Sequence, residues 1–182
     1  MIDFFFKGGA LMWPILACSV VAVALIVIKS LQFRSVLKHL SPCLEDVLER
    51  KPPLVVPIVE GIGKGLDGKQ ISFLGTLQIR SLEKGLGLLS LITVIAPLLG
   101  FTGTVTGMIQ AFMVIAAHSG SRVEPSMVAG GIYEALITTA GGLFVAIPSH
   151  VALHFLEGRL DEIALRLKNV AMALFERRDH GV

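Results

Sequence analysis

The chain has 182 residues, of which 53% are hydrophobic and only 16% are charged, whereas soluble domains carry roughly 25% charged residues. This composition excludes an ordinary soluble domain, and the small net charge of +2 gives no reason to expect a nucleic-acid partner. The two cysteines, Cys18 and Cys43, are too few for a disulfide framework. Cys18 lies within an apolar run that continues well past it, so we do not expect a lipoprotein cleavage site there.

Charged residues are almost absent from three long stretches. Residues 9–28 and 85–117 contain no Asp, Glu, Lys or Arg, and residues 127–156 contain only Glu134. A helix that spans a bilayer needs about 20 apolar residues, and all three stretches reach that length. We therefore expect an all-α, polytopic membrane protein with three transmembrane helices, whose long helices extend into the cytoplasm as a helical bundle.

The positive charges predict the orientation. Of the 16 Lys and Arg residues, nine lie within residues 29–84 and five follow residue 156. Cytoplasmic loops are the Lys/Arg-rich ones, so we expect a periplasmic N-terminus and a cytoplasmic C-terminus. The expected segments are an outer-surface interfacial segment (1–8), transmembrane helix 1 (9–28), a cytoplasmic helical segment (29–84), transmembrane helix 2 (85–117), a short extracytoplasmic loop (118–126), transmembrane helix 3 (127–156) and a cytoplasmic helical tail (157–182).

The cytoplasmic segment is expected to be largely helical. The first membrane helix should continue to about Leu40, and Ser41-Pro42 predicts the start of another helix. The glycine-rich residues 54–66 predict no clear element. From about Lys69, apolar residues at spacings of three and four predict a helix that leads directly into the second span.

The tail carries an apolar seam at alternating spacings of three and four. Its members are Leu153, Leu156, Leu160, Ile163, Leu167, Val170 and Leu174. This pattern is typical of a coiled coil or a helical bundle. The third helix should therefore continue into the cytoplasm and pack on other helices there.

Two short patterns suggest binding chemistry, but other features of the sequence argue against it. Residues 63–70 nearly match a phosphate-binding loop, yet Gln70 lacks the hydroxyl that would hold magnesium, so we interpret them as a flexible turn. His150, His154 and Glu157 share one helical face, but such side chains at the inner end of a span usually reach for headgroups and water. We expect no metal, no cofactor and no catalytic residue, and therefore no enzyme.

The second span carries a stripe of small residues on one face. Its members are Ala96, Gly100, Gly103, Gly107 and Ala111. Small residues let membrane helices approach closely, so we assign Gly100, Gly103 and Gly107 to helix packing. We expect the stripe and the tail seam to contact further copies of the chain, because one chain alone would not satisfy both.

Thr104 and Thr139 are the polar residues that suggest a pathway. In an antiparallel hairpin they lie at the same depth, roughly 20 Å inside the outer helix ends at about 1.5 Å per residue. A membrane threonine most often bonds to its own helix backbone, but two level threonines beside a glycine stripe favour a polar lining. Pro97 and Pro148 also lie nearly level, and two interpretations stay open for them: tolerated kinks, or local backbone adaptation beside a pathway.

Glu134 is the one membrane-embedded acid. A charged residue near a helix centre costs about 2.5–3.5 kcal/mol on insertion scales and usually faces protein or a water-filled cavity. Thr138 falls on the same helical face, four residues later. A role in assembly and a role in the pathway are equally open for Glu134.

These residues carry a family resemblance. Residues 96–109 and 130–148 resemble the second-helix and third-helix signatures of the ExbB/TolQ/MotA proton-channel family, and residues 7–14 resemble the start of many shorter members. Three expected spans fit the ExbB/TolQ type better than the longer MotA type. The chain departs from the larger members in lacking a long N-terminal extension, and Thr138 stands where many relatives have a small apolar residue.

The resemblance implies a subunit of a proton-channel motor in the bacterial inner membrane. Such a motor uses proton-motive force for outer-membrane import or envelope maintenance. The implied assembly is a homopentamer around an ExbD/TolR-like single-span partner with a membrane aspartate, and a TonB- or TolA-like protein is the further partner it allows. The family's pore-facing threonines map onto Thr104 and Thr139, and its membrane glutamate maps onto Glu134. The alternative is a non-conducting membrane scaffold that assembles an oligomeric complex.

Overall fold

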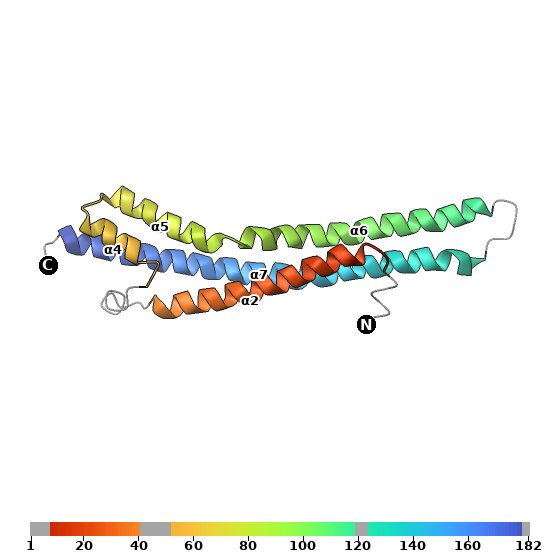
Figure 1. The fold of residues 1–182 in the computed structure, drawn as a ribbon, viewed down its shortest axis with the longest axis horizontal. Coiled ribbons are helices and arrows are strands. Elements are labelled where there is room, and N and C mark those ends of the chain that lie inside the picture. Colours follow the sequence, from red (N-terminus) through yellow and green to blue (C-terminus); the bar gives the residue numbers. More distant parts are fainter. Residues whose placement is uncertain (1–7, 41–51, 119–123, 180–182) are drawn as a thin grey trace. The chain divides into compact units, whose positions relative to one another are not determined.

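The computed structural model describes residues 8–40, 52–118 and 124–179, which are mostly helical (Figure 1). The described helices are α2 (Met12–His39), α4 (Val56–Gly63), α5 (Gly68–Glu83), α6 (Leu86–Ala117) and α7 (Pro125–Asp179). Three of them, α2, α6 and α7, are long and apolar enough to cross a membrane. These findings confirm the expected all-α fold with three candidate spans. The helix expected from Ser41-Pro42 lies outside the described residues.

Helix α7 is the longest element, with 55 residues. At 1.5 Å per residue it extends about 80 Å, far more than the roughly 30 Å hydrocarbon core of a bilayer. It continues through Pro148, and α6 likewise continues through Pro97. The prediction that the third membrane helix extends well beyond its span is therefore confirmed.

The chain divides into two compact units, which we describe separately. The first contains α2 up to Ile26, α6 from Leu88 and α7 up to Leu153. Where α6 and α7 meet, its interior is built from small side chains, including the buried Ala96 and Ala135.

The second unit contains the rest of α2, all of α4 and α5, and the C-terminal part of α7. The apolar seam of α7 is buried along its whole length, as predicted. Two cations tie the helices together through backbone carbonyls: Lys29 Nζ donates to Leu82 O at 2.9 Å, and Arg166 Nη1 donates to Leu40 O at 3.1 Å. Both carbonyls lie at the C-terminal ends of helices, where carbonyls lack intrahelical partners.

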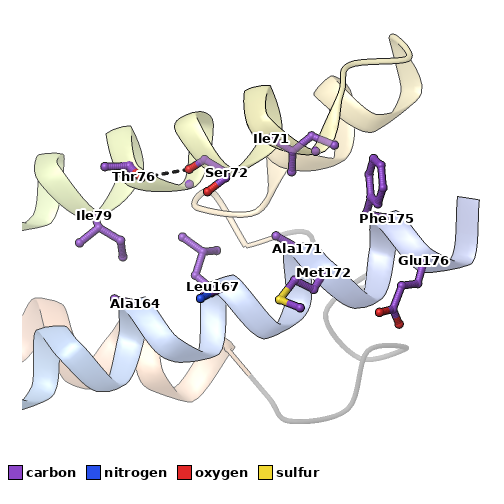
Figure 2. A pocket seen from close by; sticks show the side chains of 13 residues that line it. Ile71, Ser72, Thr76, Ile79, Ala164, Leu167, Ala171, Met172, Phe175 and Glu176 are labelled. Atoms are coloured by element: carbon purple, nitrogen blue, oxygen red, sulfur yellow. Dashed lines mark hydrogen bonds between the residues drawn. The ribbon is translucent and has the colours of Figure 1, made fainter.

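Helices α5 and α7 face each other across an apolar hollow within this second unit. Ile71 and Ile79 of α5 point toward Leu167 and Ala171 of α7, and Phe175 lies at one end (Figure 2). The hollow has a volume of about 540 Å³. Part of the α7 seam, at Leu167, thus faces the helix that precedes the second candidate span.

The glycine-rich segment 54–66 is more regular than we expected, because it contains α4. The turn after α4 needs the glycine at Gly65, whose φ is +77°. Helix α5 then begins with a capping box, in which the Asp67 side chain accepts from the N–H of Gly68 and Gln70 Oε1 accepts from the N–H of Asp67. The segment that resembles a phosphate-binding loop is therefore an ordered turn between two helices.

The prediction that this helix leads directly into the second span was wrong. Helix α5 ends at Glu83 and α6 begins at Leu86. Between them Gly85 has a φ of +98°, a conformation that a residue with a side chain rarely adopts. The apolar periodicity continues across the junction, so the spacing alone did not reveal the break.

Candidate functional site

The small-residue stripe of α6 lies directly against α7 in the first unit. A Cβ atom added to Gly100 would lie 2.9 Å from the carbonyl oxygen of Thr138 and 3.0 Å from Cα of Thr139. A Cβ added to Gly107 would lie 2.5 Å from the carbonyl oxygen of Gly131. The two helices therefore meet backbone to backbone at Gly100 and at Gly107.

Helix α7 presents a matching set of small residues, which the sequence analysis missed. A Cβ added to Gly131 would lie 2.7 Å from Gly107 O, and one added to Gly142 would lie 2.5 Å from Ala96 O. Ala135 is buried between them, with Cβ 2.8 Å from the position of a Gly107 Cβ. The signal was present in the sequence, because residues 131, 135 and 142 follow helical spacings of four and seven.

This packing corrects the expectation that the stripe and the tail seam would contact further copies of the chain. Within the described residues, α7 of the same chain already occupies the stripe. The tail seam is likewise buried, and from Leu156 onward it lies within the second unit. Helices α6 and α7 follow each other in the chain, so the stripe can meet a partner helix without a second copy.

Thr139 makes a hydrogen bond across the helix pair. Its Oγ1 donates to the carbonyl oxygen of Gly100 at 3.0 Å. In a regular helix the Gly100 carbonyl also accepts the N–H of Thr104, so Thr139 lies within one helical turn of Thr104. The Thr104 hydroxyl instead donates to Phe101 O in its own helix, at 2.6 Å. Both threonine side chains are half-buried.

Thr138 has a different environment from its neighbour. It is only 1% exposed and its side chain packs on Gly103 of α6. Its hydroxyl donates to two carbonyls of its own helix, Glu134 O at 3.0 Å and Ala135 O at 2.9 Å. Thr138 is therefore a packing residue, and its hydroxyl is not available to a pathway.

The side chain of Glu134 does not join the threonines. It is half-buried, and its Oε1 occupies the space that a Cβ at Gly9 would fill, just before α2 begins. Thr138 and Glu134 are one turn apart on α7, yet Thr138 contacts α6 and the carboxylate contacts the segment leading into α2. The structure brings Thr139 close to Thr104 and leaves Glu134 in a separate contact.

The histidine pattern gains no support from the structure. His150, His154 and Glu157 are all exposed on α7. Among the residues that the structure describes, no group of three His, Cys, Asp or Glu side chains is placed to hold a metal ion.

The α5–α6–α7 region also matches known proteins. Residues 74–169 match the model of the MotA/TolQ/ExbB proton channel family. The chain belongs to this family. The match contains Thr104, Glu134 and Thr139 and the whole of α6, and it places the chain among membrane proton-channel proteins rather than enzymes.

Individual relatives carry the names ExbB and TolQ. The chain is 40% identical over 92 residues to biopolymer transport protein exbB1 of Vibrio cholerae. This alignment covers 50% of this chain and 40% of that protein. It is 31% identical over 169 residues to a putative ExbB-like biopolymer transport protein of Synechocystis, and this alignment covers 81% of this chain and 66% of that protein. It is 41% identical over 86 residues to the Tol-Pal system protein TolQ of Haemophilus influenzae, and this alignment covers 47% of this chain and 37% of that protein. The aligned regions thus span less than two thirds of each relative.

Proposed function

We propose that the α6–α7 pair lines a proton path in which Thr104 and Thr139 provide the polar groups. The observation that carries this proposal is the half-buried hydroxyl of Thr139 at the interface, bonded to Gly100 O across the pair. The Thr139 hydroxyl and the Gly100 carbonyl place two polar atoms in an otherwise apolar helix interface. The family match over both helices supports a role in proton conduction.

The chemistry of these residues requires a partner. A threonine hydroxyl hydrogen-bonds to water but does not ionise at physiological pH. The carboxylate of Glu134 contacts Gly9 instead of the threonines. The titrating group must therefore come from another chain, and an ExbD/TolR-like protein with one span and a membrane aspartate supplies it.

Family membership supports a proposal for the whole assembly. The chain acts as an ExbB/TolQ-type subunit of an inner-membrane homopentamer, with its N-terminus in the periplasm and its C-terminus in the cytoplasm. Protons release about 2.3 kcal/mol each per 100 mV, which drives motion of one subunit against another. The relatives' names, biopolymer transport and Tol-Pal system protein, support work at the cell envelope, with a TonB- or TolA-like protein as the further partner.

The test replaces the hydroxyls without changing side-chain shape. In cells, the double variant Thr104→Val with Thr139→Val should assemble but lose energy-dependent envelope function, because a dry path makes a buried carboxylate costly to ionise. Serine at both positions keeps the hydroxyls and should retain much of the activity. Thr93→Val is the matched control, since the Thr93 hydroxyl donates to Ser90 O in the same helix.

A direct flux measurement separates the channel from the scaffold. Proton flux in vesicles that contain the complex should fall in the double valine variant and stay near the parent value in Thr93→Val. A double valine variant that assembles and keeps full flux and function would rule out the pore-lining role and favour the scaffold.

A further inference from the structure

The segment leading into α2 has an unusual backbone at the point where it meets Glu134. Gly9 has a φ of +69°, in the left-handed region that favours glycine. Its carbonyl accepts the N–H of Met12 at 3.3 Å, which forms the first turn before the helix. The carboxylate of Glu134 fills the space beside its Cα, so any side chain at residue 9 would collide with Oε1 and Cδ of Glu134.

Further contacts place the start of α2 on one face of α7. A Cβ added to Gly8 would lie 3.1 Å from Cγ2 of Ile137, and a Cβ added to Gly141 would lie 3.2 Å from Sδ of Met12. Glu134, Ile137 and Gly141 follow one another at spacings of three and four, so they share a face of α7. This face differs from the one toward α6, which carries Thr138 and Gly142.

A polar side chain suits the position of Glu134. The first turn of α2 contains no acidic residue, although a helix N-terminus carries unpaired N–H groups and a partial positive charge. The side-chain oxygens of Glu134, supplied from α7, place a polar group beside Gly9 at that end of α2. An acid within a span is costly unless it faces protein or water, and this contact provides a protein environment.

We infer that Glu134 is a positioning residue, whose carboxylate holds the start of α2 on α7, with Gly9 as its obligatory partner. Helix α7 is thereby held on two faces, by α2 at Glu134 and by α6 at Thr139. A loosened α2 would let α7 shift and would move the Thr139 hydroxyl away from Gly100. The inference goes beyond the proposed proton path, because the contact does not require conduction.

The first test compares two replacements of Glu134. Glutamine keeps the shape and a polar oxygen but does not take up or release a proton, so Glu134→Gln should keep both the α2–α7 contact and energy-dependent function. Glu134→Ala removes the contact and should lose both. The contact is measured in the full-length chain with partners present, as the yield of a disulfide between Met12→Cys and Gly141→Cys in a background lacking Cys18 and Cys43.

The second test compares two glycines that both have a positive φ. Gly9→Ala combines a positive φ with a collision against Glu134, whereas Gly65→Ala has a φ of +77° and nothing within 4 Å of the added Cβ. Gly9→Ala should lower the disulfide yield several-fold, and Gly65→Ala should leave it at the parent value. Adding Glu134→Ala to Gly9→Ala should cause little further loss, since both changes disrupt one contact.

Three results would overturn the inference. One is a Glu134→Gln variant with normal disulfide yield but no function, which would place the acid in the proton path. Another is a Glu134→Ala variant with normal yield, and the third is a Gly9→Ala variant no worse than Gly65→Ala. The disulfide yield needs no proton flux, so failure of the proposed proton path would leave it unchanged.

Discussion

The adjacent residues Thr138 and Thr139 have different environments and therefore different roles. Thr138 is buried against Gly103 and bonds only to carbonyls of its own helix. Thr139 turns toward α6 and donates to Gly100 O. Successive helical residues are rotated by about 100°, so one threonine faces the tight interface squarely and the other lies at its edge.

We expect different responses to valine at these two positions. Thr138→Val should change the free energy of unfolding little, because the carbonyls of Glu134 and Ala135 keep their helical partners. Thr139→Val should lower it by about 0.5–1.5 kcal/mol, since a bond between two helices is lost. Thermal unfolding of the purified complex in mild detergent measures both. A larger loss for Thr138→Val than for Thr139→Val would contradict this assignment.

At the scale of the elements, glycines decide where α6 begins and how closely it packs. Its small stripe fixes its distance from α7 in the first unit. In the second unit, Lys29 of α2 bonds to the last turn of α5, just before Gly85 turns the chain into α6. The packing of α6 thus depends on glycines that no larger residue replaces without moving the backbone.

The neighbouring glycines Gly130 and Gly131 provide a matched test of the helix contact. A Cβ at Gly130 meets nothing within 4 Å, whereas one at Gly131 meets Gly107 O at 2.7 Å. Gly130→Ala should be neutral or stabilise by up to about 1 kcal/mol through helix propensity. Gly131→Ala should destabilise by about 1–3 kcal/mol, because backbone atoms must move. Thermal unfolding checks both, and equal stabilities would show that α6 and α7 do not pack this closely.

At the scale of the whole molecule, the apolar surface that the chain leaves exposed is large. Helix α6 exposes Phe101, Phe112 and Met113 at 61–65%, as expected for side chains that meet lipid or neighbouring subunits. The two compact units change over near residues 26, 87 and 153, a few residues from the membrane limits expected at 28, 85 and 156. The limits of the membrane along these helices stay a prediction from charge and hydropathy.

The topology has a direct test. Single cysteines at Ser119 and Asp179, in a background lacking Cys18 and Cys43, should react oppositely with an impermeant thiol reagent. In spheroplasts the first should be labelled at once and the second only after lysis, because 14 of the 16 Lys and Arg residues lie in segments assigned to the cytoplasm. Labelling of both positions before lysis would place both outside the cell and contradict a single span between them, whereas the opposite labelling order would reverse the orientation.

The sequence by itself determined the features that depend on composition and period. Three long apolar stretches require helices in a bilayer, because lipid offers no partners for unpaired backbone groups. The α7 seam required burial through its alternating spacing, and it is buried. The small-residue stripe likewise indicated a close helix contact, because only helices with small side chains approach so closely.

Only the tertiary structure decided which surfaces meet. The stripe faces α7 of the same chain, Thr138 turns inward beside Thr139, and the carboxylate of Glu134 contacts Gly9 across more than a hundred residues of sequence. Helical period gives the face on which a residue lies, but it does not name the helix that covers that face. That choice depends on how the backbones pack in three dimensions. The break between α5 and α6 is likewise a feature of the backbone: Lys84 has a ψ of 125° and Gly85 a φ of +98°, while the apolar pattern continues.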